Sequence, residues 1–198
     1  MVSNMVFAVA TNNKKKLAEI QRILDSFGIQ AKTLKELGVE IEIEENGTTF
    51  QENAVIKAKT IAEMVSLPTI SDDSGLEVDY LNGAPGVYTA RYAGENASDD
   101  ENIDKLLNAL NGVNKENRTA RFVSAVCLYT PQGEYTVCTG TCEGWIGFER
   151  LGDGGFGYDP VFMVGDISYS QMSAQEKDKI SHRGSALRQL KDKIADFV

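Results

Sequence analysis

The sequence predicts an α/β protein in which helices flank a mixed β-sheet. One indication is an apolar run at 6–10 that leads through a polar loop into an amphipathic helix, which is typical of a strand–loop–helix unit. The other is a pair of segments, 119–130 and 134–142, rich in Val, Thr, Tyr and Phe around a Pro-Gln-Gly turn. This pattern predicts an antiparallel hairpin, so the sheet combines helix crossovers with a hairpin.

The elements after the first strand follow from periodicity. Apolar residues recur on one face between 15 and 27 and predict a helix. The segments 29–34 and 39–43 predict two further strands, because both are short, apolar and extended in pattern.

A second helix is expected to begin at Thr49 and to run to about Val65. Thr49 and Glu52 have the spacing of a capping box, which marks a helix N-terminus. Asn53 and Lys57 are four residues apart in this helix, so they lie together on a face that differs from the apolar stripe.

Two more helices are expected in the C-terminal half. Ser98 and Glu101 form a second capping box, which opens a helix that continues through Leu110. The last helix has a buried stripe consisting of Leu187, Leu190, Ile194 and Phe197. His182 and Arg183 therefore fall at the N-terminal end of this helix.

The composition limits the class of protein. The 198 residues are 42% hydrophobic and 25% charged, which is ordinary for a globular protein, and we expect a single domain over 1–198. A net charge of −9 argues against a nonspecific nucleic-acid binder, because such proteins carry an excess of Lys and Arg. No run approaches the ~18 apolar residues of a membrane helix and the N-terminus lacks a signal pattern. We expect a cytoplasmic protein with no membrane partner.

The cysteines do not suggest a metal site. Cys127, Cys138 and Cys142 lie in strand-like sequence without Cys-x-x-Cys spacing or a nearby histidine. We expect reduced thiols in the core.

The most informative segment is 70–75, where Asp72 and Asp73 follow a short apolar run and precede Gly75. Side chains alternate along a strand, so the two carboxylates face opposite sides. One is expected to be functional and the other structural. The alternative is a solvated turn, which is the usual place of an isolated Asp-Asp pair.

The loop after the first strand is a candidate anion site. Thr11, Asn12 and Asn13 offer donors at a helix start, and Lys16 lies about one turn in. The alternative is a capped surface helix with solvated lysines. The segment matches neither a Walker loop nor the Gly-x-Gly-x-x-Gly pattern, so neither P-loop hydrolysis nor dinucleotide binding is supported.

Carboxylates also suggest a divalent cation. Glu44 and Glu45 end the third predicted strand, and with Asp73 they would supply the hard oxygen ligands that Mg²⁺ prefers. The alternative is a charged turn.

A glycine-rich loop at 152–160 is a candidate base site. Its four glycines allow close approach, so Phe156 or Tyr158 would stack on a base, and Asp159 is held extended by the following proline. The alternative is a turn whose aromatic side chains anchor the core. His182 is the single histidine and, taken alone, is more often incidental than catalytic.

Six blocks in order along nearly the whole chain carry a family resemblance. Together they resemble the inosine triphosphate pyrophosphatase family. They are Thr-Asn-Asn-x-x-Lys at 11–16, Glu-Glu-Asn-Gly-x-Thr-Phe-x-Glu-Asn-Ala at 44–54, Asp-Asp-Ser-Gly-Leu at 72–76, Gly-Ala-Pro-Gly-Val-Tyr-Thr-Ala-Arg-Tyr at 83–92, Phe-Gly-Tyr-Asp-Pro-Val-Phe at 156–162 and Ser-His-Arg-Gly at 181–184. One departure is Asn12, where many members have glycine; Asn also tolerates a left-handed backbone.

The resemblance implies an elongated α/β fold with two lobes around a cleft, a homodimer and a requirement for Mg²⁺. It also implies hydrolysis of ITP, dITP or XTP to the monophosphate and pyrophosphate, which clears deaminated purines from the nucleotide pool. By motif match, Asp73 would be the catalytic base and a metal ligand, and Glu44 the second metal ligand. The substrate contacts implied are Thr11, Asn12, Asn13, Lys14, Lys15, Lys16, Lys57, Ser74 and Lys177 toward the triphosphate, and Phe156, Gly157, Tyr158, Asp159, His182 and Arg183 toward the base.

Two other functions use similar residues. A noncatalytic nucleotide sensor would release no pyrophosphate. A phosphatase with an aspartyl nucleophile would release orthophosphate, although that chemistry usually needs Asp-x-Asp spacing.

Overall fold

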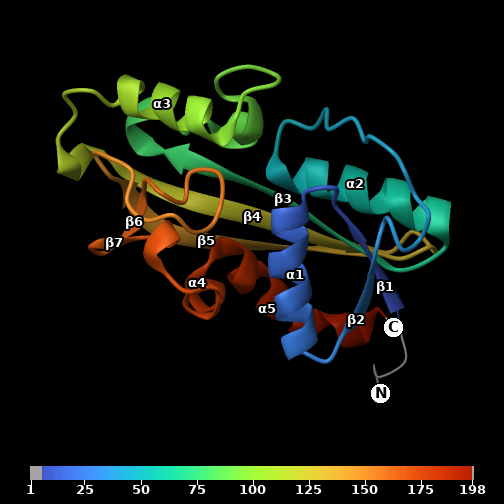
Figure 1. The fold of residues 1–198 in the computed structure, drawn as a ribbon. Helices are drawn as coiled ribbons and strands as arrows, with labels where there is room; N and C mark the ends of the chain where they lie inside the picture. The colour runs from blue at the N-terminus through green and yellow to red at the C-terminus, as the bar shows by residue number, and fades with distance from the viewer. Residues whose placement is uncertain (1–5, 198) are drawn as a thin grey trace. The chain divides into compact units, whose positions relative to one another are not determined.

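A computed structural model describes residues 6–197 and has a seven-stranded mixed sheet with flanking helices, as predicted (Figure 1). The strand order is β2-β1-β3-β4-β5-β6-β7. β1 pairs in parallel with β2 and β3, whereas β6 pairs antiparallel with β5 and β7. The strands are β1 Val6–Ala10, β2 Gln30–Thr33, β3 Thr69–Val78, β4 Thr119–Tyr129, β5 Tyr135–Ile146, β6 Phe162–Val164 and β7 Ile167–Ser168. The α-helices are α1 Lys14–Ser26, α2 Phe50–Val65, α3 Asp99–Ala109, α4 Ala174–Ile180 and α5 His182–Lys193.

The chain divides into two compact units. Unit 1 contains Met1–Asp73, Ser124–Gly140 and His182–Val198, and unit 2 contains Ser74–Val123 and Thr141–Ser181. Strands β3, β4 and β5 each contribute residues to both units. Asp73 is the last residue of its segment of unit 1, and Ser74 is the first of unit 2.

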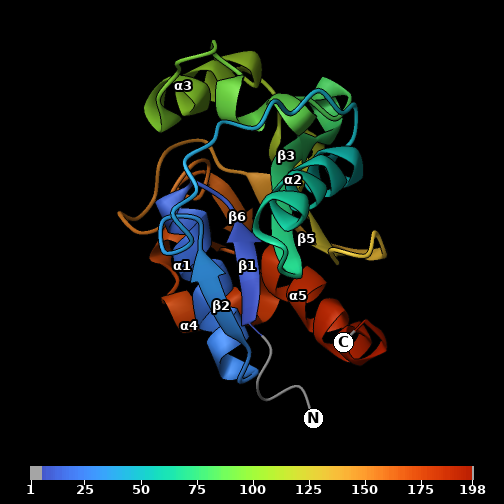
Figure 2. The same ribbon diagram turned by 90° about the vertical axis from the view of Figure 1, so that its right-hand side faces the viewer.

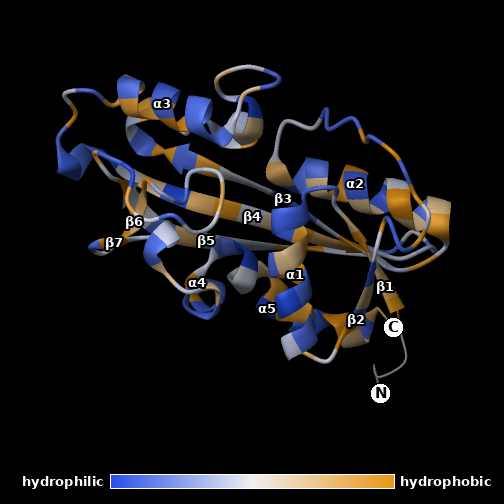
Figure 3. Cartoon of the chain, in the orientation of Figure 1, coloured by the Kyte–Doolittle hydropathy of each residue, from blue (hydrophilic) through white to orange (hydrophobic). Residues whose placement is uncertain are grey.

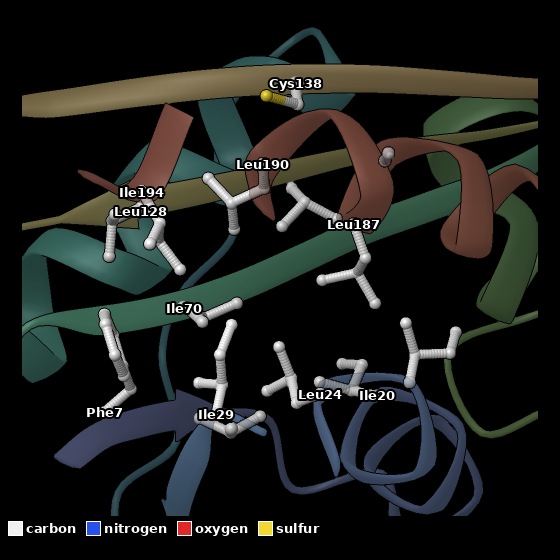
Figure 4. Packing of buried hydrophobic residues seen from close by; sticks show 14 residues of the cluster. Phe7, Ile20, Leu24, Ile29, Ile70, Leu128, Cys138, Leu187, Leu190 and Ile194 are labelled. Carbon is white, nitrogen blue, oxygen red and sulfur yellow. The ribbon is translucent and has the colours of Figure 1, made fainter. Parts of the chain in front are cut away.

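The core of unit 1 lies on both faces of β1, which Figure 2 shows beside β2. Phe7 and Val9 pack against residues of α1 and α5, whereas Ala8 and Ala10 pack against Ile61 of α2. Figure 4 shows the first of these clusters, and Figure 3 shows that α1 carries both apolar and polar residues. Side chains alternate along β1, so its small residues face α2 and its large residues face α1 and α5.

Unit 2 has its own core. The aromatic rings of Phe122, Phe162 and Tyr169 contact one another, with centroids 4.7 to 5.7 Å apart. Side chains of α3, including Ile103 and Leu106, belong to the same cluster. Aromatic contacts of this kind fix the positions of the segments that carry them.

The helices predicted at 15–27, 49–65 and 98–110 are confirmed to within a residue or two at their ends, whereas the last helix is shorter than its predicted stripe: α5 ends at Lys193, and Ile194–Asp196 form a 3-10 helix. Ser98 and Glu101 make both bonds of the capping box. Thr49 caps α2 by accepting from the Glu52 amide at 3.1 Å, but the Glu52 carboxylate accepts from the amide of Thr48 instead. The local signals therefore located these helix starts correctly.

The strand predicted at 39–43 is wrong, because these residues have no strand partner. The alternating pattern behind the prediction is real: three apolar side chains pack on the core of unit 1, namely Val39, Ile41 and Ile43. The Ile41 carbonyl accepts from the Asn12 side chain at 3.0 Å rather than from a strand amide. An extended segment with one buried face therefore alternates apolar and polar residues even when it has no hydrogen-bonded partner strand.

The three cysteines are buried and free, as expected. Burial raises the pKa of Cys127 to about 12. No helix within 6–197 is both long and apolar enough to span a membrane. Among the described residues other than glycine, only Ser66 and Asn82 have positive φ, so Asn12 does not need the left-handed backbone that glycine would allow there.

Candidate active site

Asp72 and Asp73 face different partners, as the alternation along β3 predicts. Both are buried, with 1% and 7% of their surface exposed. Asp72 contacts Lys16 and Arg183, whereas Asp73 contacts Lys57 and Asn53. Two adjacent carboxylates therefore belong to two separate clusters in unit 1.

The Asp73 cluster combines one cation with one amide from α2. Lys57 Nζ lies 3.0 Å from Asp73 Oδ1, and Asn53 Nδ2 donates to Asp73 Oδ2 at 3.2 Å. Lys57 also contacts Glu45 Oε2 at 3.1 Å. Burial disfavours the charge on Lys57, but Asp73 and Glu45 outweigh it and raise its pKa, so the ammonium stays charged.

A glycine fixes the orientation of the Asn53 amide. The Gly47 amide donates to Asn53 Oδ1 at 2.8 Å. Only an oxygen accepts this bond, so the NH₂ group must point toward Asp73. A Cβ atom at Gly47 would lie 2.6 Å from Asn53 Oδ1, which explains why glycine is needed here.

The two glutamates before Gly47 differ in position. Glu45 is half-buried and reaches Lys57, whereas Glu44, the predicted metal ligand, is exposed. The structure therefore brings Glu45 to the Asp73 cluster through a shared cation.

The Asp72 cluster is a buried ionic network. Asp72 Oδ2 lies 3.1 Å from Lys16 Nζ and 3.2 Å from an Arg183 nitrogen, and Ser124 donates to Asp72 Oδ1 at 2.5 Å. Arg183 also pairs with Glu19 of α1. Burial opposes ionisation of Asp72, yet Arg183, Lys16 and Ser124 hold its pKa well below the usual value.

Arg183 and His182, predicted to contact the base, are both buried at the start of α5. Arg183 is 1% exposed and gives donors to two carboxylates. His182 is 4% exposed, and a Cβ atom at Gly140 would lie 2.2 Å from its carbonyl oxygen. The absence of a side chain at Gly140 thus lets α5 approach β5 closely.

The loop between β1 and α1 is capped from within. Asn13 Oδ1 accepts from the amides of Lys15 and Lys16 at 3.0 and 3.1 Å. The Thr11 hydroxyl accepts from the Asn13 amide at 3.2 Å, and Lys14 and Lys15 are exposed. The strand–loop–helix prediction is confirmed, and Lys16 reaches Asp72 of β3.

In unit 2 the glycine-rich loop is held by Asp159. Asp159 Oδ2 accepts from Lys177 Nζ at 2.6 Å and from the Phe156 amide at 2.9 Å. Lys177 is 5% exposed and its Nζ lies 5.0 Å from the centroid of the Phe156 ring. Lys177 was predicted to contact the triphosphate, whereas the contacts described here are with Asp159 and Phe156, in the loop predicted to hold the base.

Two rings of this loop have different environments. Tyr158 is 2% exposed within the aromatic core, and burial raises its pKa. Phe156 is half-buried, so it keeps surface on which a base can stack.

Two other predicted substrate contacts also lie in unit 2. The Gly157 amide donates to Asp99 at 2.8 Å. Ser74 is half-buried at the start of the unit 2 part of β3.

The model of the Ham1 family matches residues 7–193. The chain belongs to the Ham1 family. This Ham1-family chain is 50% identical over 184 residues to a Bacillus licheniformis protein named dITP/XTP pyrophosphatase, covering 92% of the chain and 94% of the relative. A similar protein of Bacillus subtilis is 47% identical, covering 92% of the chain and 93% of the relative.

Solved structures agree with the Ham1 assignment. The structure of a HAM1 protein from Coxiella burnetii has a TM-score of 0.86 and 41% identity, and the match covers 97% of this chain and 99% of that one. The Staphylococcus aureus Ham1 protein has a TM-score of 0.85 and 39% identity, with 98% and 100% covered.

Sequence reasoning on this Ham1-family chain missed two members of the Asp72 network. Glu19 is a buried carboxylate three residues after Lys16, inside the apolar face of α1, and a charge in an apolar stripe was a usable signal. Ser124 lies in β4, 52 residues from Asp72, and had no local signal.

Proposed function

We propose that this chain hydrolyses ITP, dITP and XTP to the nucleoside monophosphate and pyrophosphate, and so removes deaminated purines from the nucleotide pool. Relatives named dITP/XTP pyrophosphatases that align over nearly the whole chain support this. The observation that carries the proposal is the Asp73 carboxylate held between Lys57 and Asn53. An oriented base next to a fixed cation is what attack of water on an anionic phosphorus requires.

In the proposed reaction a water oxygen attacks the α-phosphorus while Asp73 accepts the proton of that water. The bond from the α-phosphorus to its bridging oxygen breaks, and pyrophosphate leaves with the electron pair. Lys57 neutralises phosphate charge beside Asp73, and its raised pKa keeps it cationic. A general base contributes ~10²–10⁴-fold to such a rate.

We propose that carboxylate oxygens of Asp73 and of one glutamate bind a magnesium ion. Within 6–197, no three His, Cys, Asp or Glu side chains gather as a ligand set. Mg²⁺ is commonly bound by one or two carboxylates together with substrate phosphates and water, so Asp73 and one glutamate are sufficient. We assign Asp73 and Glu44 as ligands, with Glu45 as the alternative because it already shares Lys57 with Asp73. When bound, the ion would neutralise charge on the phosphates.

We assign the glycine-rich loop at 152–160, in unit 2, as the binding site of the purine base. A purine would stack on the half-buried ring of Phe156, while Asp159 and Lys177 hold the loop in place. The homodimer implied by the family resemblance and the cytoplasmic location expected from the sequence stay predictions.

The test is the replacement Asp73→Asn, which removes the base and keeps the shape. We expect pyrophosphate release from dITP with Mg²⁺ to fall at least ~100-fold, because the contribution of a general base is lost, while dITP still binds. Asp192→Asn, an exposed residue of α5, is the matched control and should behave as wild type. EDTA should abolish the wild-type reaction.

The products separate this function from its rivals. A wild-type protein that binds dITP but releases no pyrophosphate would be a sensor, and release of orthophosphate would indicate an aspartyl phosphatase. Near-wild-type turnover by Asp73→Asn would show that Asp73 is not the base.

A further inference from the structure

The segment 83–92 is one of the six sequence blocks that carry the family resemblance. In unit 2 it contains the 3-10 helix η2 (Gly86–Arg91). The Thr89 hydroxyl accepts from the Leu76 amide at 2.9 Å and donates to the Gly86 carbonyl at 2.6 Å. The Thr89 carbonyl accepts from the Tyr158 hydroxyl at 2.9 Å. One residue is therefore bonded to both β3 and the aromatic loop.

On the β3 side, Thr89 fixes the backbone just after the residues assigned to phosphate chemistry. β3 pairs with β1 through Thr69, Ile70 and Ser71. In unit 2 the Leu76 amide is bonded by the Thr89 side chain, and the Val78 amide donates to the Ala84 carbonyl at 3.2 Å. Leu76 is fully buried and only two residues beyond Ser74, so its amide needs a partner in the protein.

On the loop side, Thr89 holds the residue at the centre of the loop. Tyr158 is buried and directs its hydroxyl to the Thr89 carbonyl. Phe156 lies two residues earlier and is tied to Asp159 through its amide. The position of the Phe156 ring therefore depends on where Tyr158 is anchored.

We propose that Thr89 is a positioning residue that sets the distance between Ser74 and the Phe156 loop, so that one nucleotide contacts both at once. The proposal rests on the proposed function. Contacts at two ends of one molecule reinforce each other only when their spacing fits, as with two linked binding sites. Thr89 touches neither end of the nucleotide in this proposal and acts through Leu76 and Tyr158.

The segment has a second attachment, so losing the Thr89 hydroxyl should not unfold it. Asn102 of α3 donates to the Ala90 carbonyl at 3.0 Å and accepts from the Ala93 amide at 2.7 Å. A change at Thr89 should therefore shift the spacing while the segment stays attached to α3.

The experiment compares Thr89→Val, which removes the hydroxyl and keeps the shape, with Thr89→Ser, which keeps the hydroxyl. Thr119→Val is the matched control, because the Thr119 hydroxyl donates to Asp79 at 2.6 Å on the surface of the same unit. We expect Thr89→Val to lower kcat/KM for dITP about tenfold through KM, as the benefit of simultaneous contacts is lost. Thr89→Ser should restore it.

Two fragments of the substrate distinguish positioning from general damage. Inosine and inorganic triphosphate, used as inhibitors, each report on one end, and their inhibition constants should change less than about twofold in Thr89→Val. Tyr158→Phe, which removes the other bond to Thr89, should give the same pattern if Thr89→Val does not fold.

The proposal is overturned if Thr89→Val matches Thr119→Val, if serine does not restore kcat/KM, or if fragment inhibition weakens in parallel with dITP. A wild-type protein that releases no pyrophosphate from dITP would overturn the proposed function and this inference with it. If the wild-type protein releases pyrophosphate from dITP and Thr89→Val has the same kcat/KM, only this inference is overturned.

Discussion

Replacing Asp72 with Asn tests whether this carboxylate stabilises the fold. Its network of Asp72, Glu19, Lys16 and Arg183 contains two negative and two positive side chains. Asparagine keeps the shape and an oxygen for the Ser124 hydroxyl, but leaves two cations facing one carboxylate. The lost interaction is therefore almost purely electrostatic.

The expected loss follows from burial. Removing one partner of a buried ion pair costs about 3–5 kcal/mol, because the other charge stays buried without compensation. Arg183 retains Glu19 and Lys16 keeps 17% of its side chain exposed, so we expect the lower end, about 3 kcal/mol. Urea unfolding at pH 7, with an unchanged slope, measures this difference.

The pH dependence gives a second readout. The pKa of Asp72 is lowered in the folded state, so its stabilisation is complete above the unfolded value of about 3.9 and is lost as the pH falls through the folded value. The difference between wild type and Asp72→Asn should therefore be constant from pH 7 to about 5 and shrink below about 4. Asp192→Asn, an exposed change, should show no such difference.

Two results would refute this reasoning. One is a loss at pH 7 below about 1 kcal/mol, which is within the range of ordinary substitutions. The other is a difference that stays constant down to acid pH, because a purely steric effect of the substitution would not titrate.

Two further predictions concern the surroundings of the site. Gly140→Ala places a Cβ atom 2.2 Å from the His182 carbonyl oxygen and 2.5 Å from the Ala186 amide nitrogen. We therefore expect the free energy of unfolding in urea to fall by about 1–3 kcal/mol and dITP binding to weaken. An unchanged free energy of unfolding would mean that α5 can shift away from β5 at no cost. Glu44→Gln should raise the Mg²⁺ concentration for half-maximal pyrophosphate release several-fold more than Glu45→Gln, since Glu44 is the assigned ligand whereas Glu45 is paired with Lys57. The reverse order would favour Glu45 as the ligand.

The parts of the fold that the sequence predicted are those with local causes. The first strand was predicted at 6–10 and is found at Val6–Ala10, because a short apolar run beside a polar loop has few alternatives. Ser98 and Glu101 satisfy each other within one turn, so the start of α3 is encoded by four residues. The shared face of Asn53 and Lys57 followed from helix geometry alone, and both reach Asp73.

The parts that could not be predicted depend on residues far apart in the chain. Glu19 and Arg183 are separated by 164 positions, and neither has a neighbour in sequence that indicates the other. The segment 39–43 shows the opposite error: its pattern correctly reported one buried face, but only the sheet topology decides whether a partner strand is present. Lys177 illustrates the same limit, since its partner Asp159 is 18 residues away.

The position of the two aspartates in β3 explains why their neighbours must differ. β3 lies between β1 and β4 in the sheet, and both carboxylates are buried although they face opposite sides. A buried carboxylate needs compensation from nearby charges, and each aspartate has its own direct cationic partner on its own side. Arg183 and Lys16 compensate Asp72, and Lys57 compensates Asp73. Because a register shift of one residue would exchange their environments, the pairing of β3 with β1 through Ser71 is also what assigns each aspartate its role.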